Sequence, residues 1–196
     1  MELLLIRHAQ PFRLSDPNGA DPDLTLEGEE QAKLLAKALA DGRYGQVGHL
    51  VSSPMRRAAQ TAGFVRDALA LDLALDERLV ELNHGWTVYG ASHNYTDRRL
   101  AFDDMNNGRL GDNVFDPLLF RSRVVEGIES VAERDDDTVI AVVCHGGVIN
   151  AYLSHILGAP KIFFADPFYT SVSRVLALPD GYRQVLSLNE IDHLRP

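Results

Sequence analysis

Short apolar runs alternate with helix-like segments along this chain, and this alternation limits the fold more than any other feature. The runs ELLLI (2–6), VGHLVSS (47–53) and TVIAVVCH (138–145) have the length and apolar character of buried strands. Residues 55–70 and 146–158 follow two of these runs and read as helices. Strands that alternate with helices predict a three-layer α/β/α sandwich around a mainly parallel central sheet.

The segment LTLEGEEQAKLLAKALADG (24–42) carries the clearest helix signals. Thr25 is a suitable N-cap, acidic residues occupy the first turn, and Gly42 is a typical stop. Apolar residues recur at roughly helical spacing and predict a buried stripe. The predicted stripe consists of Leu26, Leu34, Leu35, Ala38 and Leu39.

The chain is expected to form a single domain, residues 1–196, because its length suits one compact unit. Residues 171–189 read as two final strands joined at Pro-Asp-Gly. Residues 83–116 are rich in Asn, Asp, Gly and aromatic side chains and are expected to be an irregular excursion. They form either a substrate lid or a loop with a few anchoring aromatic residues. The side chains proposed to read the leaving group are His84, Trp86, Tyr89, His93, Tyr95, Arg98, Arg99 and Phe102.

Net charge and cysteine content restrict the partners and the compartment. A net charge of -9 argues against broad binding to nucleic acid or to an anionic membrane, since both need a basic face. The single cysteine, Cys144, excludes an internal disulfide and fits a reducing compartment. No apolar run reaches the roughly 20 residues of a membrane helix. We expect a cytoplasmic protein, and the sequence leaves its oligomeric state open.

Basic and imidazole side chains follow three of the predicted strands. Arg7-His8, Arg56-Arg57 and His145-Gly146 come at or just after the strand ends, where open α/β sheets bind ligands. Arginine matches phosphate oxygens, and the helix start at Gly146 offers backbone N–H groups to an anion. The sequence therefore predicts a phosphate pocket at this edge of the sheet.

Two other uses of these residues are less consistent with the pattern. Cys144 and His145 are neighbours in a strand and point to opposite faces, so Cys144 is interpreted as a small core residue. Zinc-type spacings such as HxxxH or HxH do not occur. No metal and no cofactor are expected.

Five motifs occur in an order that resembles the histidine phosphatase superfamily, also called the phosphoglycerate mutase-like family. They are LLLIRHAQ, DLTLEGEEQA, SSPMRRAAQTA, LVELNHGW and VVCHGGVI, between residues 2 and 157. The resemblance implies a phosphohistidine intermediate on His8 and a proton donor at Glu81. It also implies that the phosphoryl group is held by Arg7, Arg57 and His145.

The chain departs from the family pattern after His8. Ala9 stands where the family commonly has Gly, and Leu14 stands where an Asn would fall. The phosphate contact of that Asn is either lost or supplied by another polar residue. The candidates are Arg13, Ser15 and Asn18.

The setting of each motif selects among neighbouring side chains. Arg57 rather than Arg56 stands directly before the AxQT pattern, and Glu81 stands in ELNHG. Asp76 and Glu77 fall outside the pattern and are expected to be surface acids.

These residues predict metal-independent hydrolysis of a small phosphomonoester. Adjacent arginines disfavour the imidazolium form of His8 and so keep it nucleophilic. Fixed arginines also stabilise the charge on the equatorial phosphoryl oxygens. Two alternatives stay open. One is a phosphomutase of the phosphoglycerate mutase type, and the other is a non-catalytic phospho-ligand-binding module on the same fold.

Overall fold

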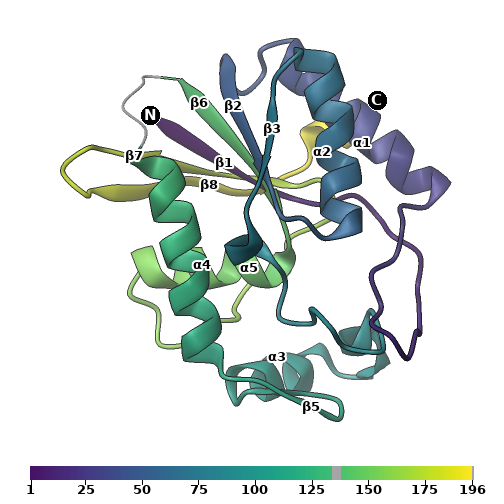
Figure 1. Cartoon of the computed structure of the whole chain (residues 1–196). Coiled ribbons are helices and arrows are strands. Elements are labelled where there is room, and N and C mark those ends of the chain that lie inside the picture. Colours follow the sequence, from purple (N-terminus) through teal and green to yellow (C-terminus); the bar gives the residue numbers. More distant parts are fainter. Residues whose placement is uncertain (134–137, 196) are drawn as a thin grey trace.

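The computed structural model describes residues 1–133 and 138–195, whose helices and strands lie in three layers (Figure 1). Within these residues the middle layer is a six-stranded sheet of order β3-β2-β6-β1-β7-β8. The first four strands are parallel, and β7 and β8 are antiparallel to their neighbours. The predicted mainly parallel sheet is confirmed. In chain order its strands are β1 (Glu2–Arg7), β2 (Val47–Ser52), β3 (Leu73–Leu75), β6 (Val139–Cys144), β7 (Val172–Ala177) and β8 (Arg183–Glu190).

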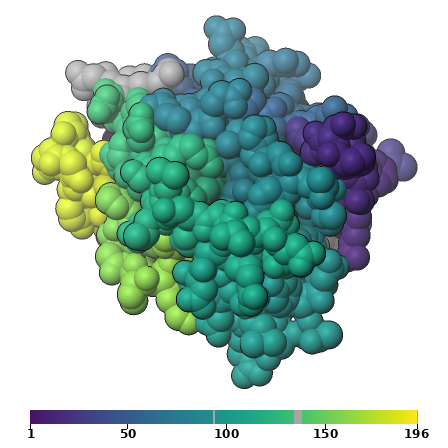
Figure 2. Space-filling view, turned by 60° about the horizontal axis from the view of Figure 1, so that its bottom comes forward, coloured from purple at the N-terminus to yellow at the C-terminus, as the bar shows by residue number. Residues whose placement is uncertain are grey.

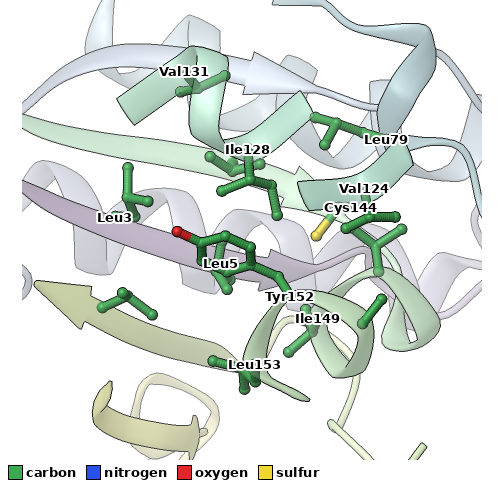
Figure 3. Packing of buried hydrophobic residues seen from close by; sticks show 14 of the residues in the cluster. Leu3, Leu5, Leu79, Val124, Ile128, Val131, Cys144, Ile149, Tyr152 and Leu153 are labelled. Carbon is green, nitrogen blue, oxygen red and sulfur yellow. The ribbon is translucent and has the colours of Figure 1, made fainter. Parts of the chain in front are cut away.

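Helices cover both faces of the sheet because β1 is apolar on both sides. Leu4 and Ile6 pack against one helix pair. Leu3 and Leu5 pack against the other pair, as Figure 3 shows. The first pair is α1 (Leu26–Ala40) and α2 (Arg56–Leu69), and the second is α4 (Pro117–Ala132) and α5 (Gly146–Ile156).

No helix in the described part of the chain is both long and apolar enough to cross a membrane.

The cap of α1 is as predicted, but part of its buried stripe is not. The Thr25 side chain accepts a hydrogen bond from the Gly28 N–H. Leu26 is 79% exposed and Leu34 43% exposed, so both were wrongly assigned to the core. The buried face instead repeats at three- and four-residue steps. Because successive helical residues point about 100° apart, Leu34 projects away from that face. The face consists of Gly28, Ala32, Leu35, Ala36, Ala38 and Leu39.

Residues 83–116 contain more regular structure than the sequence indicated. Asp97 caps a helix here by accepting from the Arg99 N–H, a signal hidden in a polar segment. The segment lies at the bottom of Figure 1, and the side chain of His93 is outside the described residues. Helix α4, which Asp116 caps, and the short strand β3 were not predicted from the sequence either. The elements of this segment are η2 (Ala91–Asn94), α3 (Arg98–Asn106), β4 (Arg109–Leu110) and β5 (Asn113–Val114).

The register of the sheet brings three strand ends to one level. Arg7 is opposite Cys144, and Ser52 is opposite Val143. The hydrogen bonds continue past the strands, because His8 N donates to Cys144 O at 2.9 Å and Ser53 N donates to Val143 O at 3.0 Å. The residues that follow β1, β2 and β6 therefore meet at one edge.

Candidate active site

His8 is buried just beyond the end of β1, and its hydrogen bonds define its tautomer. Its Nδ1 lies 2.7 Å from the Ala9 carbonyl oxygen, which can only accept, so Nδ1 carries the proton. Arg57 Nε donates to His8 Nε2 at 3.2 Å, so Nε2 carries the lone pair. Burial and the charges of Arg57 and Arg7 hold the pKa of His8 well below its usual value. His8 is thus a neutral imidazole with a basic Nε2.

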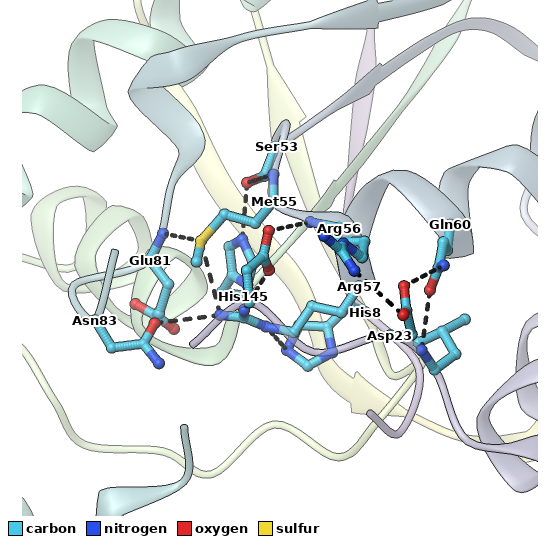
Figure 4. A network of polar contacts seen from close by, with 12 residues as sticks. His8, Asp23, Ser53, Met55, Arg56, Arg57, Gln60, Glu81, Asn83 and His145 are labelled. Carbon is cyan, nitrogen blue, oxygen red and sulfur yellow. Dashed lines mark hydrogen bonds and ion pairs between the residues drawn. The ribbon is translucent and has the colours of Figure 1, made fainter. Parts of the chain in front are cut away.

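Arg57 is fully buried at the start of α2 and is held on several sides (Figure 4). In addition to the contact of its Nε with His8, Arg57 donates from Nη1 to Asp21 Oδ1 and from Nη2 to Asn83 Oδ1, each at 3.2 Å. Its guanidinium carbon lies 4.7 Å from the centre of the Tyr89 ring. These contacts come from three separate chain segments and fix the guanidinium plane.

The neighbouring Arg56 lies outside this cluster. Its exposed guanidinium donates to Asp23 at 3.3 Å, and its backbone N–H donates to Asp21 Oδ2 at 2.8 Å. Asp21 therefore both caps α2 and orients Arg57. The structure brings Arg57 beside His8 and leaves Arg56 at the surface.

Arg7 ends β1 and reaches the cavity from the other side. Its guanidinium carbon is 4.2 Å from the centre of the Tyr169 ring, and Nη1 donates to the Pro167 carbonyl. Asp166 lies 3.9 Å from Nη1. The buried Nε has no partner among the described residues. Arg7 thus retains a donor that an oxyanion could use.

His145 is fully buried at the N-terminus of α5, and its ring centre is 5.2 Å from that of His8. Its Nε2 lies 2.8 Å from Ser53 Oγ, whereas the buried Nδ1 has no partner in the described part of the chain. Burial, followed by the charge of Arg57, keeps the pKa of His145 well below its usual value. A second neutral imidazole therefore lies beside His8.

The Glu81 carboxylate is bound to the start of α5. Oε2 accepts from the Gly147 N–H at 2.8 Å, and Oε1 accepts from the Leu82 N–H at 2.9 Å. A Cβ on Gly147 would lie 2.2 Å from Oε1, so the close approach requires glycine. Glu81 thus occupies part of the helix start that the sequence analysis assigned to phosphate. Gly146 lines the cavity next to Arg7.

These groups surround a cavity of about 120 Å³. His8, Arg7, Arg57, Glu81 and Gly146 all line it. His145 is fully buried and is not among the lining residues, but its ring is packed next to that of His8. The predicted site residues are therefore close in space although they come from distant parts of the sequence.

The replacements suggested for the family Asn are not in the cavity wall. The side chains of Arg13, Ser15 and Asn18 are exposed and lie outside it. Asn83, which the sequence analysis did not single out, lines the cavity and contacts Arg57. Ala9 is fully buried against Leu24 and Ala32, so its methyl group points into the core.

Only part of the predicted lid reaches the cavity. Trp86, Tyr89, Arg98 and Phe102 line it, whereas the other predicted side chains with a described position do not. Those others are His84, Tyr95 and Arg99.

Asp76 is not the surface acid that was predicted from the sequence. It is partly buried before the short helix η1 (Glu77–Leu79), where it accepts from the Arg78 N–H at 2.8 Å and pairs with the Arg78 guanidinium at 2.6 Å. Glu77 is exposed, as expected.

Cys144 is a buried core residue, and burial raises the pKa of its thiol. The residues that the structure describes include no cluster of three His, Cys, Asp or Glu side chains suited to a metal ion.

Several residues that orient the site were not predicted from the sequence. Asp21, Ser53, Asp166 and Tyr169 hold or flank Arg57, His145 or Arg7, and all lie far from those residues in sequence. Asp21, Asp166 and Tyr169 lie in none of the five motifs. Ser53 lies in SSPMRRAAQTA and Asn83 in ELNHG, so these two positions did carry a signal.

Comparisons with known proteins show the family and the fold. The family model of the histidine phosphatase superfamily (branch 1) matches residues 3–191. A putative phosphoserine phosphatase 2 of Hydrogenobacter thermophilus is 32% identical over 170 residues, covering 80% of this chain and 78% of that protein. A probable phosphoglycerate mutase GpmB of Enterobacter sp. (strain 638) is 27% identical over 168 residues, covering 82% and 76%. The structure of Bacillus stearothermophilus YhfR shares the fold, with a TM-score of 0.78, 21% identity and 99% of each chain covered.

Proposed function

The chain belongs to the histidine phosphatase superfamily (branch 1), and from this premise we propose that it hydrolyses phosphomonoesters through a phosphohistidine on His8. The observation that carries the proposal is the lone pair of His8 Nε2, which accepts a hydrogen bond from Arg57 on a buried ring that lines the cavity. A neutral imidazole is the nucleophilic form. The relative named as a phosphoserine phosphatase supports hydrolysis.

In the first step, the lone pair of His8 Nε2 attacks phosphorus and the bond to the leaving oxygen breaks. Glu81 reacts as the carboxylic acid: it donates its proton to the leaving oxygen, the alcohol departs, and Glu81 becomes a carboxylate. In the second step, Glu81 takes a proton from water as the water oxygen attacks phosphorus. The P–N bond then breaks, which releases inorganic phosphate and restores His8.

The phosphoryl oxygens are assigned to donors that surround His8. Arg7 offers the unpartnered Nε, and His145 offers the unpartnered Nδ1 in its protonated tautomer. Arg57 and the backbone of Gly146 complete the set. Arginine donors stabilise the charge on the equatorial oxygens in the transition state. The proposed reaction therefore needs no metal ion.

The decisive experiment traps the intermediate. Rapid acid-quench after mixing with labelled nitrophenyl phosphate should leave an acid-labile, base-stable phosphoryl group on His8, and His8→Ala should abolish both label and turnover. Activity should survive EDTA. Label on another residue, or loss of activity with EDTA that a divalent ion restores, contradicts the mechanism.

A phosphomutase of the phosphoglycerate mutase type uses the same groups, and the relative named GpmB favours it as the second candidate. A mutase must keep the phosphohistidine away from water. Incubation with 3-phosphoglycerate and phosphate analysis separates the two, since hydrolysis releases phosphate and a mutase accumulates an isomerised ester. Stoichiometric phosphate binding without turnover of any ester would instead identify a non-catalytic binding module.

The cytoplasm is the location that we propose. The single cysteine, Cys144, cannot form a disulfide within the chain, and its thiol is buried in the core. Fractionation of cells that carry a tagged chain tests this location.

A further inference from the structure

Beyond the phosphate end, most of the side chains in the wall of the same cavity are apolar, and Ser92, Asn150, Arg98 and Asp166 are polar or charged. The wall is built mainly from residues 83–116, shown in teal spread over one face of the molecule in Figure 2. Phe163, which precedes β7, also lines the cavity. The apolar and aromatic side chains of this wall are Trp86, Val88, Phe102, Met105, Leu110 and Phe163.

Hydrogen bonds and ring contacts hold the wall in place. The Asn106 side chain at the end of α3 donates to the Phe163 carbonyl at 2.8 Å and accepts from the Phe163 and Ile162 N–H groups at 3.0 and 2.8 Å. Phe115 lies 6.1 Å from Trp86 and 6.0 Å from Phe163 between ring centres. The apolar wall is therefore a preformed surface.

Among the described residues that line the cavity, no cation is left unpaired for a second anion. The described lining residues include three arginines, of which Arg7 and Arg57 face His8. The third, Arg98, is bound to the Asp166 carboxylate. A phosphate dianion uses the first two, and a carboxylate on the leaving group would have to displace Asp166 or lie beside it.

Resting on the proposed function, we propose that the substrate is a phosphomonoester of an uncharged alcohol that bears an apolar or aromatic group. The phosphate binds at Arg7 and Arg57, and the apolar group lies against Phe102 and Met105. Burial of that group removes apolar area from water. Anionic esters such as phosphoglycerates gain neither this burial nor a free cation.

The test compares three esters whose alcohols all need a proton on leaving. These are benzyl phosphate, glycerol 3-phosphate and 3-phosphoglycerate, with nitrophenyl phosphate as a reference for turnover. We expect kcat/KM for benzyl phosphate to exceed that for glycerol 3-phosphate by about tenfold or more, from burial of an aromatic ring. The value for 3-phosphoglycerate should be the lowest. Equal values, or 3-phosphoglycerate as the best ester, overturn the proposal.

Substitutions test whether the apolar wall causes the expected preference for benzyl phosphate. Phe102→Ala should lower the benzyl-to-glycerol ratio several-fold, whereas Leu100→Ala should not change it, because Leu100 is exposed on the same helix and outside the cavity. Asp166→Asn frees Arg98 and should raise the relative efficiency with 3-phosphoglycerate by up to about fivefold. An unchanged ratio in folded Phe102→Ala protein contradicts the assignment.

Failure of this inference differs from failure of the proposed function. Turnover of nitrophenyl phosphate with 3-phosphoglycerate as the best ester overturns only the substrate class. If nitrophenyl phosphate is not hydrolysed either, the proposed function fails, and calorimetry with the three esters then decides the ligand class. Tightest binding of benzyl phosphate supports the apolar wall, and tightest binding of 3-phosphoglycerate overturns it.

Discussion

Arg57 donates from Nε to His8 Nε2 across 3.2 Å, so the arginine occupies the same lone pair that the proposed attack on phosphorus uses. One lone pair cannot serve both contacts. A bound phosphoryl group must therefore take the Arg57 hydrogen bond, and the released Nε2 then faces phosphorus. The contact keeps Nε2 unprotonated until the oxyanion replaces it.

Replacement of Arg57 should lower kcat far more than replacement of the adjacent Arg56. Arg57→Lys removes the planar donor set that contacts His8, Asp21 and Asn83 together. We expect kcat to fall by about 10²–10³-fold, the usual cost of a transition-state donor. Arg56→Lys is the matched control and should stay near parent activity in steady-state assays. Similar losses in both variants would remove Arg57 from the phosphate site.

The importance of Glu81 should depend on the leaving group. Nitrophenolate leaves without a proton, whereas an alkoxide does not, so Glu81→Gln should slow phosphorylation by an alkyl phosphate by about 10²–10⁴-fold relative to the parent. Phosphorylation by nitrophenyl phosphate should change little, and a burst before slow turnover should appear in stopped-flow traces. Glu77→Gln, at an exposed acid, is the control. Equal losses with both esters would exclude Glu81 as the acid.

Gly147→Ala should reproduce much of the Glu81 defect without changing the carboxylate itself. The added methyl group would lie 2.2 Å from Glu81 Oε1 and must displace it, whereas a methyl group on Gly146 would meet Arg7 Nε at an ordinary 3.7 Å. We expect the larger loss of alkyl phosphate turnover in Gly147→Ala. Parallel melting curves show whether both proteins are folded, and a larger loss in Gly146→Ala would contradict the geometry.

Acid should destabilise the fold in part through His193. Burial lowers the pKa of His193 to about 4, from an ordinary value of 6.5, beside Tyr44 and Thr170. Between these values the unfolded chain binds more protons than the folded one. The contribution of His193 to stability is therefore complete above pH 6.5 and is lost as the pH falls toward 4.

The dependence of the unfolding free energy on pH can be measured by urea unfolding at a series of pH values. His193→Gln should make the fall in unfolding free energy between pH 6.5 and 4.5 shallower than in the parent, by up to about 1.4 kcal/mol per pH unit. His155→Gln, at an exposed position on α5, should keep the parent slope. An unchanged slope in His193→Gln would show that His193 titrates normally in the folded protein.

The sequence predicted β1, β2, β6, β7 and β8 and the polar residues that follow β1, β2 and β6, because these are local properties, but it did not predict the short strand β3. Leu3 to Ile6 are apolar on successive positions, so β1 had to be buried on both faces, and Arg7 and His8 had to follow at its end. The start of α1 could likewise be predicted, because Thr25 is a suitable N-cap residue. The meeting of three strand ends at one edge was also expected from a mainly parallel sheet, whereas the register that places Arg7 opposite Cys144 comes from the structure.

Only the tertiary structure decided how the site is oriented and which way each helix faces. Leu26 and Leu34 are as apolar as Leu35, and the packing of α1 alone determines that they are exposed. Asp21 and Tyr169 touch the arginines across long stretches of chain, and no local pattern records such contacts. Periodicity determines secondary structure within a few residues, whereas the partner of a buried charge depends on where whole elements pack.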